Sequence, residues 1–484
     1  MLETVLSFFK FKAIKTRMKK LFLFIAILFT ATVSHSANPD SVVIRKIYDA
    51  ELTNGECYQN LKVLCKSIGH RLSGSPQAEQ AVYWGKKIME KAGFDKVYLQ
   101  EVMVPHWVRG KNESGMLILS NYPKRKDGTP VSSSIKITAL GGSVGTNGKL
   151  TAEVIEVNDF EELKRLGPEN IKGKIVLFNR PFDPTYIHTF NSYGHCVDQR
   201  VHGAKEAAQY GAKAVVIRSM THGEGDHPHT GAMKYDDSIP KIPAVAVSTV
   251  VADEISKELK AGRPVKMTLN LDCQWLPDVK SYNVIGEITG KEFPDEIISV
   301  GGHLDSWDIG EGAHDDGAGC VQSMEALRLF KVLGIQPKHT LRAVLFMNEE
   351  NGLRGGKKYA EQAHEKNEKH IAALESDRGG FVPRGFAIEG NQKEIDWLQS
   401  LAPLFKAYDL HYFEPGGSGA DIGPLKKYFP DIVLFGFVPD SQRYFDHHHA
   451  ETDVFENVNR RELELGSAAM AAFLYVLDNH LANH

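Results

Sequence analysis

The sequence predicts an α/β fold, and three observations indicate it. Short apolar runs occur at residues 297–300, 340–347 and 371–374, and such runs are typical of buried strands. Stretches with helical spacing of apolar residues separate them, as from Ala318 onward. Each run is followed by histidine or carboxylate residues. Because open α/β sheets bind ligands at the carboxyl ends of their strands, we expect these side chains to meet in one site.

Composition limits the classes of protein to consider. The chain has 484 residues, a net charge of −4 and 42% hydrophobic residues, which is enough apolar material for a large core. This charge balance gives no reason to expect a nucleic-acid partner. Five cysteines are too few, and odd in number, for a disulfide scaffold. At most two pairs can form, and we expect all five to be free and buried: Cys57, Cys65, Cys196, Cys273 and Cys320.

The first 36 residues predict an export signal with an N-terminal extension. A Met-Lys-Lys sequence at 18–20 provides a basic start, residues 21–33 are apolar, and small residues precede Ala37, as at a signal cleavage site. Either Met1 or Met18 can be the true start. The apolar run is shorter than the ~20 residues that a membrane span needs. We therefore expect an exported protein, periplasmic or secreted, without a stable membrane anchor.

The chain is expected to form a main domain that is interrupted by an insert. Residues 40–94 have a helical pattern, and strand-like segments follow. From residue 141 to residue 272 the pattern changes to several short strands with two helical runs, which indicates a separate α/β module. We therefore expect one domain from residues 37–140 and 273–484, with the module 141–272 inserted in it.

Two loops are candidates for substrate binding. A histidine-rich run at 221–231 is a candidate second metal site, but its Gly and Pro residues provide no rigid scaffold, so a solvated or substrate-facing loop is expected. A Gly-rich loop at 416–421 is either a simple turn or a pocket wall whose backbone N–H groups bind an anion. The candidate contacts are His229, Gly417, Ser418 and Asp421.

His303, which directly follows the first apolar run and Gly301-Gly302, is the first candidate metal ligand. Asp305 lies two residues on and points the same way in an extended chain, so its carboxylate is expected to accept the other ring N–H of His303. A Gly-rich segment then leads to Asp315 and allows the backbone to approach closely. A lone His-x-Asp is common in surface loops, so the later strand ends decide the interpretation.

Further carboxylates and a histidine complete the candidate site. Glu349 and Glu350 follow the second run, Asp377 follows the third, and three histidines end at His449. Two histidines and three carboxylates suit a pair of divalent ions bridged by one carboxylate: His303, Asp315, Glu350, Asp377 and His449. Nitrogen with oxygen ligands favours two Zn²⁺ per chain, with Mn²⁺ or Co²⁺ as alternatives. Glu349 is the candidate general base for a metal-bridging hydroxide.

The sequence resembles the di-zinc exopeptidase family that includes the bacterial zinc aminopeptidases, over nearly all of the chain after residue 36. The matching motifs are Arg71-Leu72-Ser73-Gly74-Ser75, Pro105-His106-Trp107, His229-Thr230-Gly231, Lys241-Ile242-Pro243, Gly302-His303-Leu304-Asp305-Ser306-Trp307-Asp308, Asp315-Asp316-Gly317, Glu349-Glu350 and Glu375-Ser376-Asp377. The resemblance implies a mixed central sheet between helices, an inserted protease-associated domain and a homodimer. It also implies that His303, Asp315 and Asp377 hold one ion, that Asp315, Glu350 and His449 hold the other, and that Glu349 is the base.

The sequence departs from the family pattern at the last ligand. In the family this histidine lies four residues before an Asp that Thr usually follows, whereas Val454 follows Asp453 here. Counting back four residues gives His449, and His448 stays open as an alternative. Asp316, beside the bridging Asp315, is expected to be structural.

These patterns predict a zinc metallopeptidase that hydrolyses dipeptides or short peptides, as a dipeptidase, carboxypeptidase or aminopeptidase, with Glu349 and Asp305 as catalytic residues. Two alternatives belong to other classes: a glutaminyl-cyclase-like acyltransferase, and a receptor-like module of the same fold without catalysis. The inserted module argues against the first and the complete ligand set against the second. The side-chain preference of the enzyme is left open.

Overall fold

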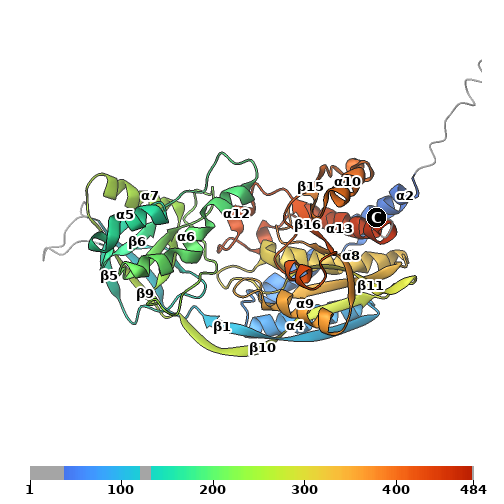
Figure 1. Cartoon of the computed structure of the whole chain (residues 1–484), viewed down its shortest axis with the longest axis horizontal. Helices are drawn as coiled ribbons and strands as arrows, with labels where there is room; N and C mark the ends of the chain where they lie inside the picture. Colours follow the sequence, from blue (N-terminus) through green and yellow to red (C-terminus); the bar gives the residue numbers. More distant parts are fainter. Residues whose placement is uncertain (1–37, 120–131, 482–484) are drawn as a thin grey trace, which may run out of the picture. The chain divides into compact units, whose positions relative to one another are not determined.

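The computed structural model describes residues 38–119 and 132–481, and its ribbon is drawn in Figure 1. Two eight-stranded sheets form its framework. The expected signal segment, residues 1–36, and the expected mature N-terminus at Ala37 lie outside the described residues. Within the described ranges, no helix is both long enough and apolar enough to span a bilayer.

The first sheet contains the three apolar runs that the sequence singles out. Its strands are β1 (Lys96–Val108), β10 (Gln274–Ile288), β11 (Phe293–His303), β12 (His339–Phe346), β13 (Lys369–Glu375), β14 (Pro383–Glu389), β15 (Tyr412–Pro415) and β16 (Val433–Pro439). Their order across the sheet is β1-β10-β12-β11-β13-β16-β14-β15. The central strands β12, β11, β13 and β16 run parallel, whereas β10 and β14 join them antiparallel. The sheet is therefore mixed, as the resemblance implies.

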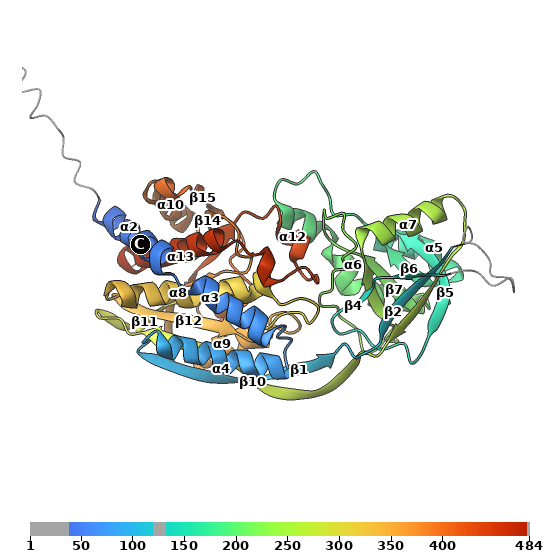
Figure 2. The ribbon, with the colours of Figure 1, turned by 180° about the vertical axis from the view of Figure 1, so that it is seen from behind.

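Helices cover both faces of this sheet (Figures 1 and 2). They are α2 (Pro39–Asn54), α3 (Cys57–Val63), α4 (Pro76–Lys91), α8 (Ala318–Leu333), α9 (Arg354–Glu365), α10 (Gln392–Ser400), α11 (Ala402–Phe405), α12 (Tyr444–His447) and α13 (Arg460–His480), with π-helical turns at Leu64–Ile68 and Ala313–Gly317. Gly85 of α4 faces Leu345 of β12, and Tyr359 of α9 packs on Val344 from the opposite face. All of β12 is buried, as expected for a parallel strand covered on both sides.

The inserted module forms the second sheet and begins earlier than the sequence predicts. Its strands are β2 (Glu113–Leu119), β3 (Ser133–Ile135), β4 (Thr138–Ala139), β5 (Leu150–Val157), β6 (Ile175–Phe178), β7 (Ala214–Arg218), β8 (Ala244–Val247) and β9 (Val265–Leu271). The order is β3-β2-β9-β5-β6-β7-β8-β4. Strand β2 pairs antiparallel with β9 from Glu113 to Leu119. Local pattern does not show such a long-range pairing, so the boundary at residue 141 is about 28 residues late by sheet membership.

Helices α5 (Phe160–Ile171), α6 (Thr189–Gln209) and α7 (Thr249–Lys260) pack on the second sheet. The sequence does not predict α5. It predicts a helical run at residues 201–210, whereas α6 begins about twelve residues earlier. The first half of α6 was missed because the buried residues Gln199 and Arg200 are polar and interrupt the apolar pattern, although the helix itself is continuous.

The five cysteines are free and buried, as predicted. Cys320 of α8 donates its thiol hydrogen to the His303 carbonyl at 3.1 Å. The sulfur atoms therefore contribute to packing rather than to covalent cross-links.

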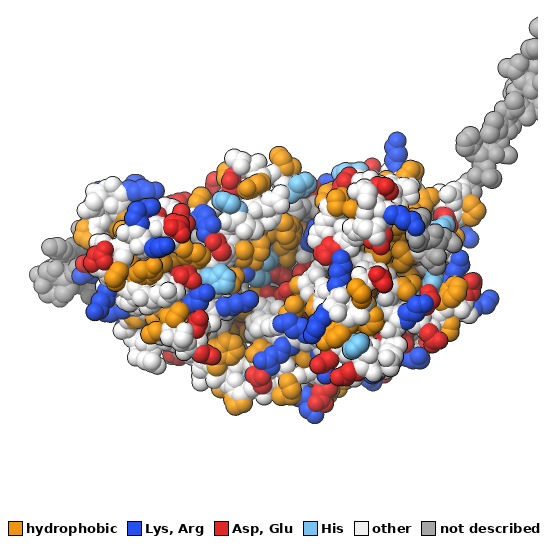
Figure 3. Space-filling model, viewed as in Figure 1, with side chains coloured by type: hydrophobic (Ala, Val, Ile, Leu, Met, Phe, Trp, Pro, Cys, Tyr) orange, Lys and Arg blue, Asp and Glu red, His pale blue; other side chains and the backbone are white. Residues whose placement is uncertain are grey.

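On the surface, acidic and basic side chains are interspersed over the face drawn in Figure 3.

Arg71 fixes the segment that follows β11. Its side chain is fully buried, and its guanidinium donates hydrogen bonds to the carbonyls of Leu304 at 2.7 Å, Glu311 at 2.6 Å and Gly312 at 2.8 Å. Buried carbonyl groups cost free energy when they lose their donors. The arginine in the first motif of the resemblance is therefore a structural clamp on the loop that leads to Asp315.

We predict that Arg71→Met lowers the free energy of unfolding by about 3 kcal/mol, because several buried carbonyls lose charged donors. Denaturant unfolding of the metal-free protein measures the change. Arg165→Met is the matched control, since that side chain is 72% exposed and its loss is expected to change stability by less than about 0.5 kcal/mol. Equal stabilities of the two variants would contradict the clamp.

Candidate metal centre

The carboxyl ends of β11, β12 and β13 bring the predicted ligands together. His303 is the last residue of β11, Glu350 lies four residues beyond the end of β12, and Asp377 lies two beyond the end of β13. Parallel registers align these ends, with His303 opposite Phe346 and Gly301 opposite Glu375. Parallel pairing places all three ends at one edge of the sheet, as the sequence predicts.

The first group of ligands consists of His303, Asp315 and Asp377. His303 Nε2 lies 3.1 Å from Asp315 Oδ1 and 3.4 Å from Asp377 Oδ1. One ligand atom from each residue lies within 4.8 Å of the other two, a spacing that a single ion can fill. His303 and Asp315 are buried, whereas Asp377 is 24% exposed on its side chain. The group is thus open to solvent on the side of Asp377.

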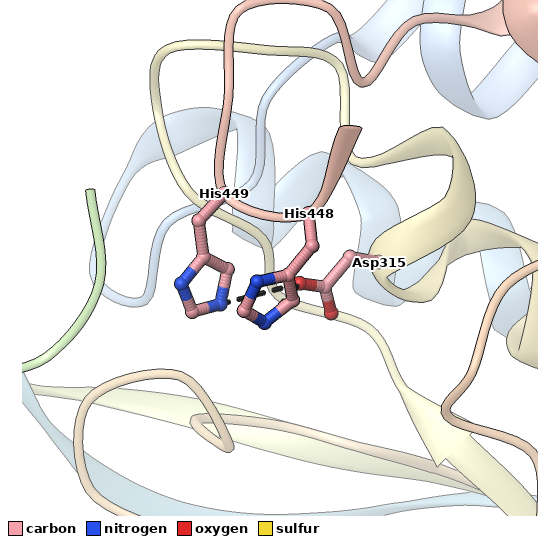
Figure 4. Close-up of side chains that lie close together, drawn as sticks. All are labelled: Asp315, His448 and His449. Carbon is pink, nitrogen blue, oxygen red and sulfur yellow. Dashed lines mark ion pairs between the residues drawn. The ribbon is translucent and has the colours of Figure 1, made fainter. Parts of the chain in front are cut away.

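The second group is centred on the other oxygen of Asp315. His449 Nε2 lies 3.2 Å from Asp315 Oδ2 and 3.0 Å from Glu350 Oε2. His448 Nε2 is farther from Asp315 Oδ2, at 3.7 Å. Figure 4 shows the two imidazoles next to one another and to one side of Asp315, with ring centroids 3.6 Å apart. The geometry favours His449 as the ligand because it contacts both carboxylates, whereas His448 lies farther from Asp315.

The hydrogen bond of the other ring nitrogen decides what His303 offers the site. Its Nδ1 lies 2.9 Å from the Asp305 carbonyl oxygen, which only accepts, so Nδ1 carries a hydrogen. In the neutral ring, Nε2 then has a lone pair directed at the oxygens of Asp315 and Asp377. A positive charge must therefore lie between these atoms. A proton on Nε2 can form a hydrogen bond with one of the two carboxylates at a time, whereas a divalent ion can bind the nitrogen and both carboxylates together.

Unpartnered oxygens support the same conclusion. Within the described residues, Asp315 Oδ2 and Glu350 Oε1 are buried and accept no hydrogen bond. Buried carboxylate oxygens without donors are costly unless a cation compensates them. The donor set of imidazole nitrogen and carboxylate oxygen matches the preferences of Zn²⁺ and similar divalent ions. The residues present therefore fit a pair of metal ions that share Asp315.

The electrostatics of the histidine pair also separate His449 from His448. Although burial favours a neutral ring, Glu350 and Asp315 raise the pKa of His449 to about 9. Burial and the neighbouring His449 ring lower the pKa of His448 well below its usual value. The negative potential that attracts a cation is thus concentrated at His449.

Asp305 has a different contact from the one that the sequence predicts. Its carboxylate lies 4.0 Å from His303 Nδ1, and its backbone carbonyl takes the ring hydrogen instead. The carboxylate accepts the backbone N–H groups of Asn348 at 2.6 Å and Glu349 at 3.0 Å, and a longer one from Glu350. The expectation was wrong because β11 ends at His303, so the extended-strand geometry no longer applies at Asp305.

Asp316 and Asp453 hold the backbone around Asp315. Asp316 accepts the N–H groups of His303 and Gly319, each at 3.0 Å, which agrees with the structural role expected for it. Asp453 accepts the N–H groups of His314 at 2.7 Å and Asp315 at 3.1 Å, and burial raises its pKa to about 7. The Asp that marks the last ligand in the family pattern is therefore also an anchor for the bridging residue.

Glu349 lies beside the centre without belonging to either group of ligands. Its residue is half-buried, and the strand has already ended, so Glu349 and Glu350 need not face opposite ways. Burial raises the pKa of Glu349 well above its usual value, and Asp377 and Glu350 add to this effect. Nearby cations would lower that pKa again. A carboxylate in this position suits proton transfer.

The inserted domain contacts the metal ligand His449 directly, a feature that the sequence does not reveal. Thr230 donates its backbone N–H to the His449 carbonyl at 2.8 Å, and the Thr230 carbonyl lies 3.3 Å from His449 Nδ1. Arg200 Nη1 lies 3.2 Å from the same nitrogen. Only the His229-Thr230-Gly231 motif signalled this contact, without indicating its partner. The insert therefore helps to set the orientation of the last ligand.

Three of the four candidate substrate contacts are buried in structural roles. Ser418 donates both its N–H and its hydroxyl to Glu389, each at 2.8 Å. Asp421 is fully buried, and its N–H donates to Glu375. His229 is buried and its backbone forms a bridge with Ala450. Gly417 alone lines an open pocket. The expected anion site fails because the chain's own carboxylates take the N–H groups of the loop.

Comparisons with known proteins agree with this geometry. The family model "Peptidase family M28" matches residues 283–474, and the model "PA domain" matches residues 115–255. Carboxypeptidase Q of Homo sapiens is 36% identical over 423 residues, which cover 87% of this chain and 84% of that protein. Carboxypeptidase Q of Bos taurus is 34% identical with the same coverage.

Solved structures show the same fold. The crystal structure of a peptidase M28 precursor from Shewanella amazonensis is 30% identical, with a TM-score of 0.83, and the match covers 91% of this chain and 96% of that one. The zinc aminopeptidase BSAP from Bacillus subtilis shares the fold at 20% identity, with a TM-score of 0.59 and 86% and 93% coverage. This chain therefore belongs to peptidase family M28, as a metallopeptidase with a PA domain inserted between β1 and β10.

Proposed function

We propose that the protein is a di-zinc exopeptidase that hydrolyses dipeptides or short peptides. The observation that carries the proposal is the position of Asp315, whose two oxygens face two separate groups of ligands at 3.1 Å and 3.2 Å. One carboxylate shared in this way is the arrangement of a two-metal hydrolytic site. The complete ligand set argues against a receptor-like module, and the inserted PA domain argues against a cyclase-like acyltransferase.

His303, Asp315 and Asp377 would hold one ion, and Asp315, Glu350 and His449 the other. When bound, two zinc ions would supply Lewis-acid activation of a water molecule and of the scissile carbonyl. The Asp305 carbonyl holds His303 in the tautomer that presents Nε2. Through the N–H groups that it accepts, the Asp305 carboxylate keeps the loop carrying Glu349 and Glu350 at the centre. Asp305 is thus a positioning residue.

Glu349 is proposed as the general base. Its carboxylate would take a proton from the attacking water and deliver it to the leaving amine. Its raised pKa in the absence of cations agrees with a site where the charge of neighbouring acids must first be compensated. The side chains of Asp377 and Glu349 are also the anionic groups that a free α-amine of a substrate would approach.

Small substrates are proposed because the site has walls on two sides. Residues of the 416–421 loop and of the inserted domain line one pocket together with Arg378, which directly follows the candidate ligand Asp377. We further propose export, from the N-terminal signal pattern. A homodimer is proposed only from the family resemblance.

We predict that the purified enzyme binds two zinc ions per chain. His449→Ala is expected to lose one ion and at least 100-fold in rate, since it removes a ligand between two carboxylates. His448→Ala is the matched control and is expected to keep both ions. Metal analysis after gel filtration measures the stoichiometry. Loss of an ion from His448→Ala, with retention in His449→Ala, would reverse the ligand assignment.

Glu349→Gln should lower kcat by roughly 10²–10⁴-fold, because an amide cannot act as the general base. Both metal ions are expected to remain, since Glu349 is outside the ligand groups. Glu350→Gln serves as the comparison and should lose metal as well as rate. Steady-state kinetics combined with metal analysis distinguishes the two variants. An empty site in Glu349→Gln would show that it is a ligand.

Unblocked dipeptides are expected to be better substrates than N-acetylated dipeptides or long peptides cleaved at internal bonds. A free α-amine gains charge-assisted hydrogen bonds from carboxylates at the centre, whereas an acetylated one cannot. Hydrolysis of a small peptide panel with free and blocked termini, followed by product separation, provides the measurement. Efficient cleavage of an N-acetylated dipeptide would point to a broader peptidase.

A further inference from the structure

A pocket of about 440 Å³ has a lining that includes none of the candidate metal ligands, and the chemistry of that lining is still unassigned. One wall comes from the inserted domain, with His188, Phe190 and Asn191, and another from the 416–421 loop, with Gly416 and Gly417. Arg378 also lines the pocket. This residue directly follows the metal ligand Asp377, and consecutive Cα atoms are about 3.8 Å apart. The pocket therefore begins where the first ligand group ends.

Arg378 is held in place without a carboxylate partner. Its Nη2 donates to the Gly417 carbonyl at 2.8 Å, and its guanidinium carbon lies 5.2 Å from the centroid of the Phe190 ring. Among the described residues, this guanidinium forms no ion pair and no other hydrogen bond. The side chain is half-buried. A partly desolvated guanidinium with unused donors is suited to bind a planar anion.

The other charged groups of the pocket compensate one another. Arg384 pairs with Asp440 at 2.8 Å, and Asp440 is the one acidic residue among those that line the pocket. Two arginines and one aspartate give the pocket a charge of +1 when its histidines are neutral. Asp377 is the nearest acid to Arg378 in sequence, but the proposed metal would use its charge. The positive charge of Arg378 is thus left for a ligand.

A row of packed aromatic rings lies next to Arg378. Phe190 stacks on Tyr444 with ring centroids 5.3 Å apart, and Tyr444 contacts His448 at 5.1 Å. This aromatic row runs from His448, which stacks on the candidate ligand His449, to the Phe190 ring next to Arg378. A substrate that spans the two positions would lie along it, with an apolar contact for its body and a cation for its end.

We propose that Arg378 binds a carboxylate of the peptide substrate in this pocket, an inference that rests on the proposed peptidase function. Either the terminal α-carboxylate or an acidic side chain has the required chemistry. The sequence suggested that backbone N–H groups of the 416–421 loop bind an anion, and this role passes to Arg378. The loop contributes the Gly417 carbonyl that orients the guanidinium. Arg378 is therefore a specificity-determining residue of the enzyme.

The test measures binding in the Glu349→Gln background, so that substrate is not consumed. Calorimetric titration compares Ala-Ala with Ala-Ala amide, and Ala-Glu amide with Ala-Gln amide. The carboxylate form of one pair is expected to bind roughly 10- to 100-fold more tightly than its amide, through charge-assisted hydrogen bonds. Arg378→Gln should remove this preference and leave the affinity for the amide unchanged. Arg378→Lys should retain part of it, since the charge remains but the planar fork is lost.

Arg263→Gln is the control variant, because Arg263 pairs with Glu258 at 2.6 Å in the inserted domain, outside the pocket. Preference within the first peptide pair identifies the α-carboxylate, and preference within the second identifies an acidic side chain; both support the proposal. Equal losses for acid and amide in Arg378→Gln, or no loss for either, would overturn it. Metal content checks that each variant keeps its centre. Peptide hydrolysis by the unmodified enzyme is measured separately, so a failure of the peptidase proposal is distinguishable from a failure at Arg378.

Discussion

The Asp315 carboxylate lies between two imidazoles, and the rest of the site is arranged around that contact. Its two oxygens lie 3.1 Å from His303 Nε2 and 3.2 Å from His449 Nε2. For this contact the segment 303–315 must meet the distant segment that carries His449. Much of the buried polar structure nearby serves to hold them: Asp453 receives the N–H of Asp315, and Arg71 clamps the loop before it. Buried anions of this density are tolerable only with cations between them.

Asp305 positions groups of the candidate site through two of its own groups, the backbone carbonyl and the side-chain carboxylate. Asp305 uses its carbonyl to orient His303 and its carboxylate to hold the turn that carries Glu349 and Glu350. One residue thus links the ends of β11 and β12, which parallel pairing already places side by side. A change at Asp305 is expected to affect the ligand and the proposed base together, because both depend on it.

The inserted domain is part of the centre and not an appended module. Its Thr230 contacts both the backbone and the ring of His449, and its residues 188–191 form a wall of the pocket that contains Arg378. In the proposed enzyme, the PA domain would therefore contribute both to the orientation of His449 and to the substrate pocket. Walls from two domains would restrict an open sheet edge, which by itself admits long peptides, to short ones.

The sequence by itself determined the strands that carry the candidate ligands and which residues belong to the candidate site. The apolar runs that became β11, β12 and β13 predicted which residues lie at one edge, because parallel strands covered on both faces must be apolar throughout. His303, Asp315, Glu350, Asp377 and His449 do come together. The buried, free state of the cysteines was also predicted, from their small and odd number.

Only the tertiary structure decided the contacts that depend on turns and on distant segments. Because β11 ends at His303, the Asp305 carboxylate contacts three backbone N–H groups rather than the His303 ring, which no strand rule predicts. The pairing of β2 with β9 moved the domain boundary to Glu113. The backbone N–H groups of Ser418 and Asp421 donate to Glu389 and Glu375, whereas Arg378 was left with unused donors. Local pattern shows which groups a chain carries, but which of them find partners is settled by packing between segments far apart in sequence.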